Sequence, residues 1–435
     1  MDSLEKTFED ACSNGVIPGA VLAASSKDGC FTYCKAFGFS SLEDHTPLDK
    51  SAVFALASCT KLITTIAALQ QIEQGKISLE DDVACVVPEL ARLEIVSETP
   101  DGDLKFTKRT QPITLRHLLT HSSGKSYDFM APVLQKYNKS KGLPPMPPNR
   151  SVVETYASPL IFEPGTSWHY GSSVDWAGLV VERLSGMDLD TYFKQNIFEP
   201  LGIFDMTFWP GKSAQVQAKR VAGSVRSPDG NVVPFKGPSF VAGATAPLGG
   251  QGLYASVPSY LKILQSILVD NEKLLKKETS AMMFTPQLAE ESRSELQALY
   301  KSQPQSGPCS IGYFPPDTKY SWGLGGLLTM EDVNECGPGY RRRNCLTWSG
   351  ALNSFWFIDR EAQVCGIYGG EAIPPGDRKI NQMIITFEKA IYQQKAQDGH
   401  PYGIVSRNTT NTRIVSKKYK VLIVIIATTP TTALQ

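Results

Sequence analysis

The sequence predicts a mixed α/β fold, in which an antiparallel sheet is flanked by helices and interrupted by an inserted helical domain. Near the N-terminus, the strand-like stretches 20–24 and 31–37 flank turn residues at 27–29, which predicts a β-hairpin. Strand patterns return from Tyr320, in "YSWGLGGLLTM", "NCLTWSG", "SFWFID" and "AQVCGIYGG". Strands at both ends around a helical middle therefore indicate one interrupted domain.

Helical patterns occupy the middle and the end of the chain. An apolar helix begins near Ser58 and ends at Gly75, since glycine commonly follows the last helical residue. Short helices and loops are expected from Leu79 to about Ser185, and a final amphipathic helix over 377–397.

These patterns predict three parts. Residues 1–75 and 187–398 form a mixed sheet domain, residues 76–186 a helical insertion, and residues 399–435 a disordered tail. The tail contains the apolar run 421–427, whose seven residues are too few to span a bilayer, which needs about 20.

The composition limits the possible partners. Lysine and arginine together number 43, as do aspartate and glutamate, so the formal net charge is zero. A neutral chain argues against a general electrostatic role on nucleic acid or an anionic membrane. We expect a small or weakly charged partner molecule, no nucleic acid, and no membrane.

The N-terminus and the cysteines indicate the compartment. The acidic start "MDSLEKTFEDACSNGV" lacks the basic and apolar regions of a secretory signal. The nine cysteines are scattered and include no Cys-x-x-Cys pair, which argues against a disulfide framework. The chain is therefore expected in a reducing cytoplasm.

Ser58 and Lys61 are a candidate nucleophile and base. Ser-x-x-Lys also begins at Ser3, Ser122 and Ser259, but only Ser58 starts a strongly apolar helix; Ser259 is expected to open an exposed turn. Residues three apart share a helix face, and burial near a helix N-terminus favours the neutral amine that accepts a proton. The alternative is that Ser58 caps the helix while the lysine side chain reaches solvent.

Two further stretches carry polar groups at expected edges of the fold. Tyr170 follows a Pro-Gly turn and precedes a helix, where a phenol could relay protons; its alternative role is a tyrosine at the core edge. Trp348 to Ala351 end a strand. Gly350 permits close approach, and the Ala351 N–H could join that of Ser58 as an oxyanion hole; the alternative is a glycine bulge.

In order and spacing, Ser-x-x-Lys, Tyr-x-Ser and Trp-Ser-Gly resemble the serine β-lactamase-like superfamily. The phrases "LRHLLTHSSG", "PLGIFDMTF" and "GGQGLYAS" agree with this resemblance, which covers residues 1–398. Within the superfamily the chain is most similar to fungal acyltransferases of the lovastatin-pathway (transesterase) type. The resemblance implies a β-lactamase/transpeptidase-like fold.

The chain departs from true β-lactamases at two positions. Trp348 stands where those enzymes carry a lysine that binds the substrate carboxylate, and Ser172 stands where they usually carry asparagine. Without the cation an anionic β-lactam loses its charge-assisted contact, whereas an aromatic wall suits a neutral acyl chain. Acyl-ester chemistry is therefore favoured over β-lactam hydrolysis.

The resemblance implies a ping-pong acyl transfer. Ser58 attacks an ester or a thioester, including one carried on an acyl carrier protein, with Lys61 as base and Tyr170 assisting. An alcohol acceptor then takes the acyl group from a monomeric enzyme without a cofactor. A carboxylesterase on the same fold is the alternative, and a catalytically silent scaffold is a third hypothesis.

His117 and His121 have the i, i+4 spacing of metal ligands on a short helix. No glutamate-containing zinc signature accompanies them, so we expect a scaffold role and no metal. Cys59, beside the nucleophile, is expected to face the core.

Overall fold

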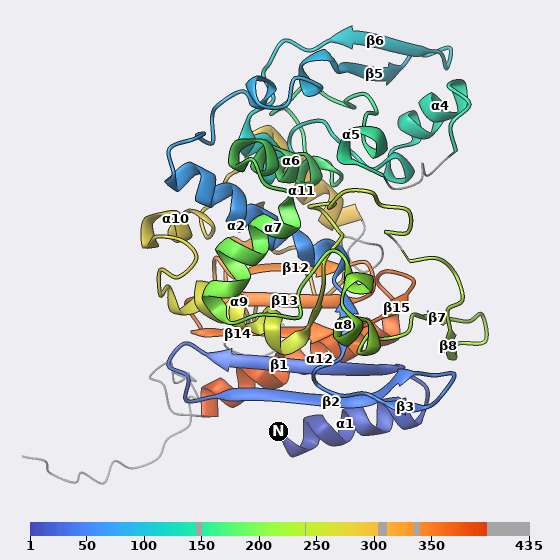
Figure 1. The fold of residues 1–435 in the computed structure, drawn as a ribbon, viewed down its shortest axis with the longest axis vertical. Coiled ribbons are helices and arrows are strands. Elements are labelled where there is room, and N and C mark those ends of the chain that lie inside the picture. Colours follow the sequence, from blue (N-terminus) through green and yellow to red (C-terminus); the bar gives the residue numbers. More distant parts are fainter. Residues whose placement is uncertain (145–149, 240, 303–310, 335–339, 398–435) are drawn as a thin grey trace, which may run out of the picture. The chain divides into compact units, whose positions relative to one another are not determined.

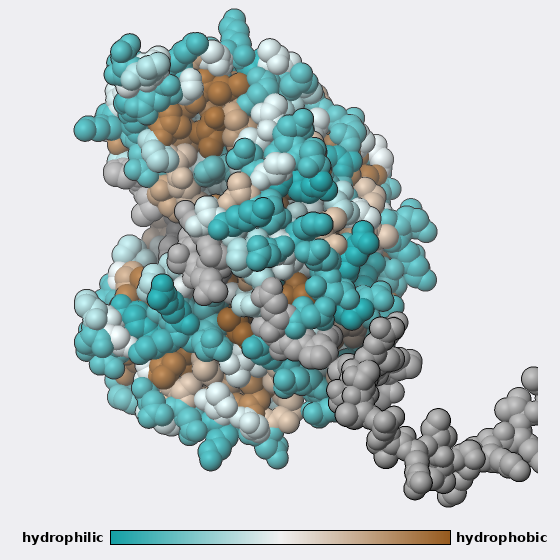
Figure 2. Space-filling model, turned by 180° about the vertical axis from the view of Figure 1, so that it is seen from behind, coloured by the Kyte–Doolittle hydropathy of each residue, from teal (hydrophilic) through white to brown (hydrophobic). Residues whose placement is uncertain are grey.

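The computed structural model describes residues 1–144, 150–239, 241–302, 311–334 and 340–397 (Figure 1). All of these residues fall within one compact unit. The predicted tail 399–435, with its apolar run, lies outside the described residues. Within the described ranges, no helix is long and apolar enough to cross a membrane. The face opposite to that of Figure 1 is largely hydrophilic, with separate hydrophobic patches (Figure 2).

An eight-stranded sheet forms the centre of the fold, and all its neighbouring strands are antiparallel, as predicted. Its strand order is β10-β11-β12-β13-β14-β1-β2-β3, so the N-terminal hairpin pairs directly with the C-terminal strands. The strands are β1 Gly19–Ser26, β2 Thr32–Ser41, β3 Thr46–Pro47, β10 Tyr320–Trp322, β11 Leu327–Thr329, β12 Leu346–Gly350, β13 Ser354–Asp359 and β14 Val364–Gly369.

Helices cover both faces of this sheet. Every residue of β1, β13 and β14 is buried, which requires cover on both sides. Helices α1 (Asp2–Ser13) and α12 (Arg378–Gln397) contact each other and the sheet on one face. Helix α9 (Val257–Val269) packs against β1, β13 and β14 on the other face of the sheet.

The position of α9 corrects one expectation. Ser259 was expected in an exposed helical turn, but it is buried, because α9 is a full helix that covers the sheet. The predicted final helix agrees with α12.

The helix that follows Ser58 is the most buried of the fold. In α2 (Thr60–Glu73), twelve of the fourteen residues are buried. The helix packs against α6 (Ser173–Ser185), against α7 (Leu189–Phe193) and against the short turn Ala57–Cys59 that precedes it. Gly75 and Gly186 follow α2 and α6 with positive φ, as the predicted helix ends require.

Shorter elements complete the unit. The helices are α3 Leu115–Leu119, α4 Pro132–Ser140, α5 Val152–Thr155, α8 Ala214–Ala218, α10 Lys277–Met282 and α11 Glu290–Ser302. One small sheet consists of β4 (Val53–Ala55) and β9 (Tyr254–Ser256). Another consists of β15 (Ala372–Ile373), β7 (Ser224–Arg226) and β8 (Val232–Pro234), in that order.

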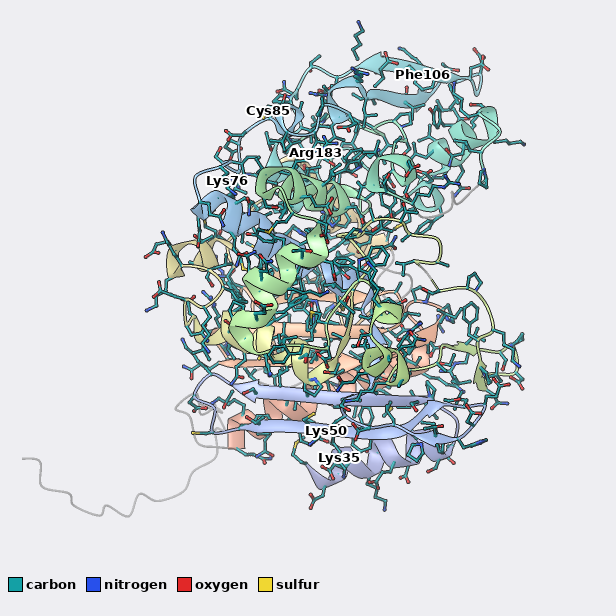
Figure 3. The ribbon with its side chains drawn as sticks, in the orientation of Figure 1. Lys35, Lys50, Lys76, Cys85, Phe106 and Arg183 are labelled. Carbon is teal, nitrogen blue, oxygen red and sulfur yellow. The ribbon has the colours of Figure 1, made fainter. Side chains whose placement is uncertain are left out.

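A hairpin interrupts the region that was expected to be helical. Strands β5 (Glu94–Glu98) and β6 (Leu104–Lys108) pair around Gly102, whose φ of +88° suits a tight turn. Most of β6 is exposed, including Phe106, which lies at the outer end of the molecule (Figure 3). Leu104 and Phe106 alternate with polar residues in β6, but five residues are too short a run to predict a strand. The domain boundaries at 75/76 and 186/187 stay a prediction.

A buried ion pair attaches α12 to the chain that precedes β12. The Arg341 guanidinium donates to both carboxylate oxygens of Glu388, at 2.6 and 2.8 Å, and both side chains are 0% exposed. The Tyr340 hydroxyl donates to the same carboxylate at 2.5 Å, and the Tyr313 carbonyl accepts from Arg341 at 2.6 Å. The charges are thus fully paired, as burial requires.

Replacing Glu388 by glutamine should therefore destabilise the protein strongly. The substitution leaves the Arg341 charge buried without its partner, and we expect a loss of about 3–5 kcal/mol in the free energy of unfolding. Urea unfolding followed by tryptophan fluorescence measures it. Glu43→Gln is the matched control, because Glu43 and Lys236 form an exposed pair at 3.2 Å; its cost should stay below about 1 kcal/mol. Equal losses in the two variants would contradict the role given to burial.

Candidate active site

Ser58 lies in a short 3-10 turn, Ala57–Cys59, that leads directly into α2. Its side chain is half-buried, whereas the Cys59 side chain beside it is fully buried, as expected. Ala57 has a φ of +44°, a left-handed conformation that costs an alanine about 1–3 kcal/mol. The fold therefore holds the serine on a strained turn. The helix-cap alternative is wrong, because Cys59 occupies the cap position and no side chain caps α2.

Lys61 points into the protein. It is only 2% exposed, so the alternative in which its side chain reaches solvent is wrong. Its Nζ lies 3.3 Å from Ser58 Oγ, 3.0 Å from the Tyr127 hydroxyl and 2.7 Å from the Gly250 carbonyl oxygen. In the neutral amine, two N–H groups serve Tyr127 and Gly250, which leaves the lone pair for the Ser58 proton. The predicted nucleophile and base are thus in contact.

Tyr127 and Asp175 extend this contact into a buried network that no sequence motif revealed. The Tyr127 hydroxyl donates to Asp175 Oδ2 at 3.4 Å, and the Gly250 N–H donates to Asp175 Oδ1 at 2.8 Å. Asp175 therefore holds both groups that hold Lys61. The available signal was a lone carboxylate on the apolar face of the helix after Tyr170.

Burial changes the acidity of this network. It raises the pKa of the Asp175 carboxyl to about 6, although the Lys61 charge and the Gly250 N–H oppose the rise. Burial, followed by the Asp175 charge, raises the pKa of the Tyr127 hydroxyl well above its ordinary value. Tyr127 is therefore a neutral phenol that accepts from Lys61 and donates to Asp175.

Tyr170 also lies against Lys61, next to Tyr127, with the two tyrosine ring centroids 5.9 Å apart. Its ring centroid is 4.8 Å from Lys61 Nζ, and its hydroxyl oxygen accepts a hydrogen bond of 3.2 Å from Trp348 Nε1. The Trp348 ring packs on Tyr170 at 5.1 Å and on Trp322 at 4.6 Å, and it is 2% exposed. The indole therefore orients the phenol, and little of its surface is free to contact a substrate.

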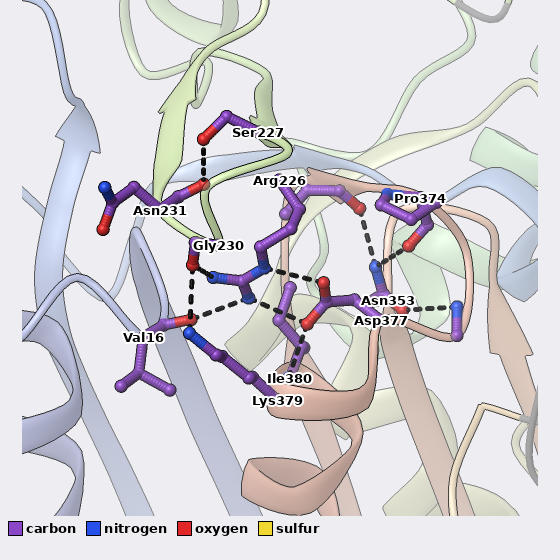
Figure 4. Close-up of polar contacts among 12 residues, drawn as sticks. Val16, Arg226, Ser227, Gly230, Asn231, Asn353, Pro374, Asp377, Lys379 and Ile380 are labelled. Carbon is purple, nitrogen blue, oxygen red and sulfur yellow. Dashed lines mark hydrogen bonds and ion pairs between the residues drawn. The ribbon is translucent and has the colours of Figure 1, made fainter.

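The end of β12 lies against the turn that carries Ser58, the candidate nucleophile. A Cβ atom at Gly350 would come within 2.4 Å of the Leu56 carbonyl oxygen, so only glycine permits this close approach. Ala351 opens the following turn. There, Asn353 Nδ2 donates to the carbonyls of Ala372 and Pro374 at 2.7 and 2.9 Å (Figure 4). The turn with the candidate oxyanion N–H is thus anchored by a side chain.

A salt bridge between Arg226 and Asp377 fixes the chain segment that Asn353 also binds. Arg226 on β7 donates to both oxygens of Asp377 at 2.8 Å and to the Val16 carbonyl at 2.8 Å (Figure 4). Asn353 Oδ1 accepts from the Gly376 N–H at 2.9 Å. The segment before α12 is therefore fastened to the turn on one side and to β7 on the other.

Ser172 and the two histidines have contacts of their own, and the His121 ring packs on the Tyr170 ring with centroids 4.6 Å apart. Ser172 is fully buried, and its hydroxyl donates to the Ser126 carbonyl at 3.3 Å. His117 completes a helix cap with Thr114. His121 does not share that helix, because α3 ends at Leu119 and His121 has a φ of +60°. Within the described ranges, no group of three His, Cys, Asp or Glu residues could hold a metal ion.

Trp348→Phe should slow acylation of the serine. The variant keeps an aromatic ring but removes the N–H that donates to Tyr170, and we expect roughly a fivefold to tenfold loss. Stopped-flow release of p-nitrophenol from p-nitrophenyl butyrate measures the rate. Trp356→Phe is the control, because Trp356 pairs with Trp348 across the strands and its Nε1 has no partner among the described residues. An equal slowing in both variants would contradict the role of the hydrogen bond.

Asp175→Asn should remove an acidic limb from the pH profile. Below a pH of about 6 the wild-type Asp175 is protonated and no longer accepts from both Tyr127 and Gly250, so kcat/KM should fall. The amide does not titrate, so the variant should be about tenfold slower at pH 8 and lack that limb. Asp359→Asn, another buried carboxyl, is the control that should retain it. Persistence of the limb in Asp175→Asn would exclude Asp175 as its source.

Known proteins resemble this chain over most of its length. A family model described as Beta-lactamase matches residues 2–369. Lovastatin esterase of Penicillium rubens is 38% identical, over 90% of this chain and 98% of its own. Monacolin J acid methylbutanoyltransferase of Aspergillus terreus is 35% identical, over 91% and 96%.

A solved structure has the same fold as this chain. The LovD6 mutant of simvastatin synthase from Aspergillus terreus has a TM-score of 0.84 and 35% identity, over 92% of this chain and 98% of its own. The predicted fold and the predicted resemblance to the fungal acyltransferase branch are confirmed. On these matches, the chain belongs to the β-lactamase family and is an enzyme with that family's serine β-lactamase fold.

Proposed function

We propose that this enzyme is a serine acyltransferase of fungal-type secondary metabolism, which transfers an acyl group to a polyketide-like alcohol through an acyl-Ser58 intermediate. The observation that carries the proposal is the contact between Ser58 Oγ and the buried Lys61 amine at 3.3 Å. The relatives named as methylbutanoyltransferases support transfer as the reaction.

In the first half-reaction, Ser58 Oγ attacks the carbonyl carbon of an ester or thioester donor and its proton passes to the Lys61 amine. The Ser58 and Ala351 N–H groups hold the oxyanion of the tetrahedral intermediate. The bond from carbon to the leaving oxygen or sulfur then breaks. The leaving group takes the proton from Lys61, with the phenol of Tyr170 beside the amine.

In the second half-reaction, the hydroxyl of the acceptor attacks the acyl-Ser58 carbonyl. Lys61, assisted by Tyr170, takes the hydroxyl proton and returns it to Ser58 Oγ as the new ester leaves. Tyr127, Gly250 and Asp175 contact no reacting atom in this scheme. They are positioning residues, because they fix the Lys61 amine through both half-reactions.

Hydrolysis is the second candidate. It is favoured by the 38% identity to a relative named as an esterase, and by the half-buried Ser58, which water can reach. The two reactions share the acyl-enzyme and differ only in which nucleophile enters second. A catalytically silent scaffold is disfavoured, because it would need neither the contact between Ser58 and Lys61 nor the strain at Ala57.

The proposal also covers the acyl donors, the oligomeric state and the cellular compartment. Donors include small thioesters and acyl groups on a carrier protein, and the enzyme acts as a monomer in the cytoplasm. The seven cysteines within the described residues are all free, which supports a reducing compartment.

Intact-mass spectrometry tests the acyl-enzyme. We expect the wild type to gain one butyryl group from p-nitrophenyl butyrate, and Ser58→Ala to gain none. Ser122→Ala is the matched control, because Ser122 also begins a Ser-x-x-Lys sequence but is buried and bonded to Thr120; it should acylate as the wild type does. A wild type that never gains the adduct from any reactive ester would refute the proposal.

The same acyl-enzyme separates transfer from hydrolysis. Pre-formed butyryl-enzyme mixed with a panel of hydroxylated acceptors should yield butyrate esters faster than free butyrate. Free acid as the sole product with every acceptor would favour the esterase instead.

A further inference from the structure

His121 is a buried histidine that the mechanism above does not use. It is 0% exposed, and its φ of +60° is a left-handed backbone conformation, which histidine, asparagine and aspartate adopt more often than other residues with a side chain. This conformation directs both the carbonyl and the ring of His121 toward the loop that carries Tyr170.

His121 accepts hydrogen bonds from the two backbone N–H groups on either side of Tyr170. Its carbonyl oxygen accepts from the His169 N–H at 3.1 Å, and its Nδ1 accepts from the Gly171 N–H at 3.4 Å. Its ring packs on the Tyr170 ring, with centroids 4.6 Å apart. One residue therefore holds the Tyr170 ring and the chain both before and after it.

The held tyrosine lies beside the reacting groups. The Tyr170 ring centroid is 4.8 Å from Lys61 Nζ, which is 3.3 Å from Ser58 Oγ. A shift of the Tyr170 backbone would move the phenol relative to the Lys61 amine and to Trp348 Nε1, which donates to its hydroxyl at 3.2 Å. Misplacing a catalytic group by about 1 Å can cost roughly hundredfold in rate, so the residue that fixes Tyr170 influences the chemistry.

His121 holds the loop as a neutral imidazole. Since Nδ1 accepts from the Gly171 N–H, the ring proton is on Nε2. Burial, followed by the Lys61 charge, lowers the pKa of His121 well below its ordinary value, so the ring is neutral at neutral pH. A neutral ring keeps the Nδ1 lone pair for Gly171. It also adds no second positive charge near Lys61 when the amine takes the serine proton.

The Nε2–H group indicates that stability alone does not account for this histidine. Among the described residues, Nε2 has no hydrogen-bond partner, and the ring also packs on Trp322 at 5.1 Å and Trp168 at 6.1 Å. Indole N–H groups donate and do not accept, so neither tryptophan satisfies Nε2–H. A buried donor without an acceptor destabilises the fold. An apolar residue at this position would avoid that loss but would also remove the acceptor for Gly171.

We propose that His121 is a positioning residue for Tyr170, which fixes the phenol beside the Lys61 amine by accepting from the N–H groups that flank Tyr170. It contacts no reacting atom. This inference rests on the proposed acyl transfer, in which Tyr170 assists Lys61, and it adds the residue that sets the position of the phenol. The i, i+4 spacing of His117 and His121 thus joins two histidines with separate roles.

Acylation by p-nitrophenyl butyrate tests the role. His121→Leu loses the Nδ1 acceptor and disfavours the left-handed backbone, so we expect the rate at saturating ester to fall roughly tenfold to hundredfold, with the half-saturating concentration changed less than about twofold. His121→Asn keeps an acceptor oxygen near the Nδ1 position and tolerates the left-handed backbone, so it should retain at least about a third of the wild-type rate. An unchanged rate in His121→Leu, or an equal loss in both variants, would overturn the proposal.

His117→Asn is the matched control, because His117 completes a helix cap with Thr114 and has no contact with Tyr170 among the described residues. Its rate should change less than about twofold. A loss as large as that of His121→Leu would show a general loosening of this segment and refute a specific role. A melting temperature well above the assay temperature establishes that each variant is folded. If His121→Leu does not fold, His121→Gly takes its place, since glycine adopts the left-handed backbone freely and offers no side-chain acceptor.

A double-mutant cycle tests whether His121 acts through Tyr170. In a Tyr170→Phe background the phenol hydroxyl is already absent, so adding His121→Leu should slow acylation by less than about threefold. Fully additive losses would refute action through the Tyr170 hydroxyl.

The position of Tyr170 is also measured without turnover, by fluorine NMR of 3-fluorotyrosine placed at position 170 in Ser58→Ala protein. We expect one sharp resonance, which His121→Asn preserves and His121→Leu broadens or splits. An unchanged resonance in His121→Leu would overturn the positioning role. If the wild type forms no acyl-enzyme but the resonance depends on His121, the acyl-transfer proposal fails while the positioning of Tyr170 stands.

Discussion

The buried Lys61 amine is the contact on which the rest of the site depends. Three separate parts of the chain converge on it: the turn with Ser58, the loop with Tyr127 and the backbone at Gly250. Burying an amine is costly unless its N–H groups find acceptors. The fold supplies two acceptors and leaves the third direction for Ser58. The same arrangement thus satisfies the amine and aims its lone pair, so stability and chemistry impose one geometry.

The sheet provides the opposite wall of the site. Close approach of β12 to the Leu56 carbonyl requires glycine at position 350, and this approach sets where Ala351 and Trp348 lie. The strained Ala57 turn is held between that strand and the buried helix α2. Local strain persists only where surrounding packing over-determines it. The N-terminal hairpin and the C-terminal strands meet in one sheet, where Val21 pairs with Gly369 although the two residues lie far apart in the sequence.

The sequence patterns predicted the helices and strands that have a regular apolar spacing. They missed the features that depend on tertiary packing. The hairpin β1–β2, the strands after Tyr320 and the helices ending at Gly75 and Gly186 have clear apolar spacing and turn residues. The hairpin β5–β6 buries Val96, but its two strands have only five residues each and are rich in charged residues, so the pattern was too short to be recognised. The burial of Ser259 and the exclusion of His121 from α3 depend on packing and on one left-handed residue, which spacing does not encode.

The sequence by itself predicted Ser58, Lys61 and Tyr170 as the catalytic residues, because a helix places i and i+3 side chains on one face and the three motifs keep their order. Only the tertiary structure decided the rest. It turned Lys61 inward instead of outward, added Tyr127 and Asp175, and made Trp348 a support for Tyr170 more than an exposed wall. These are contacts between residues far apart in sequence, and their free energies arise only when the chain has folded and water has left.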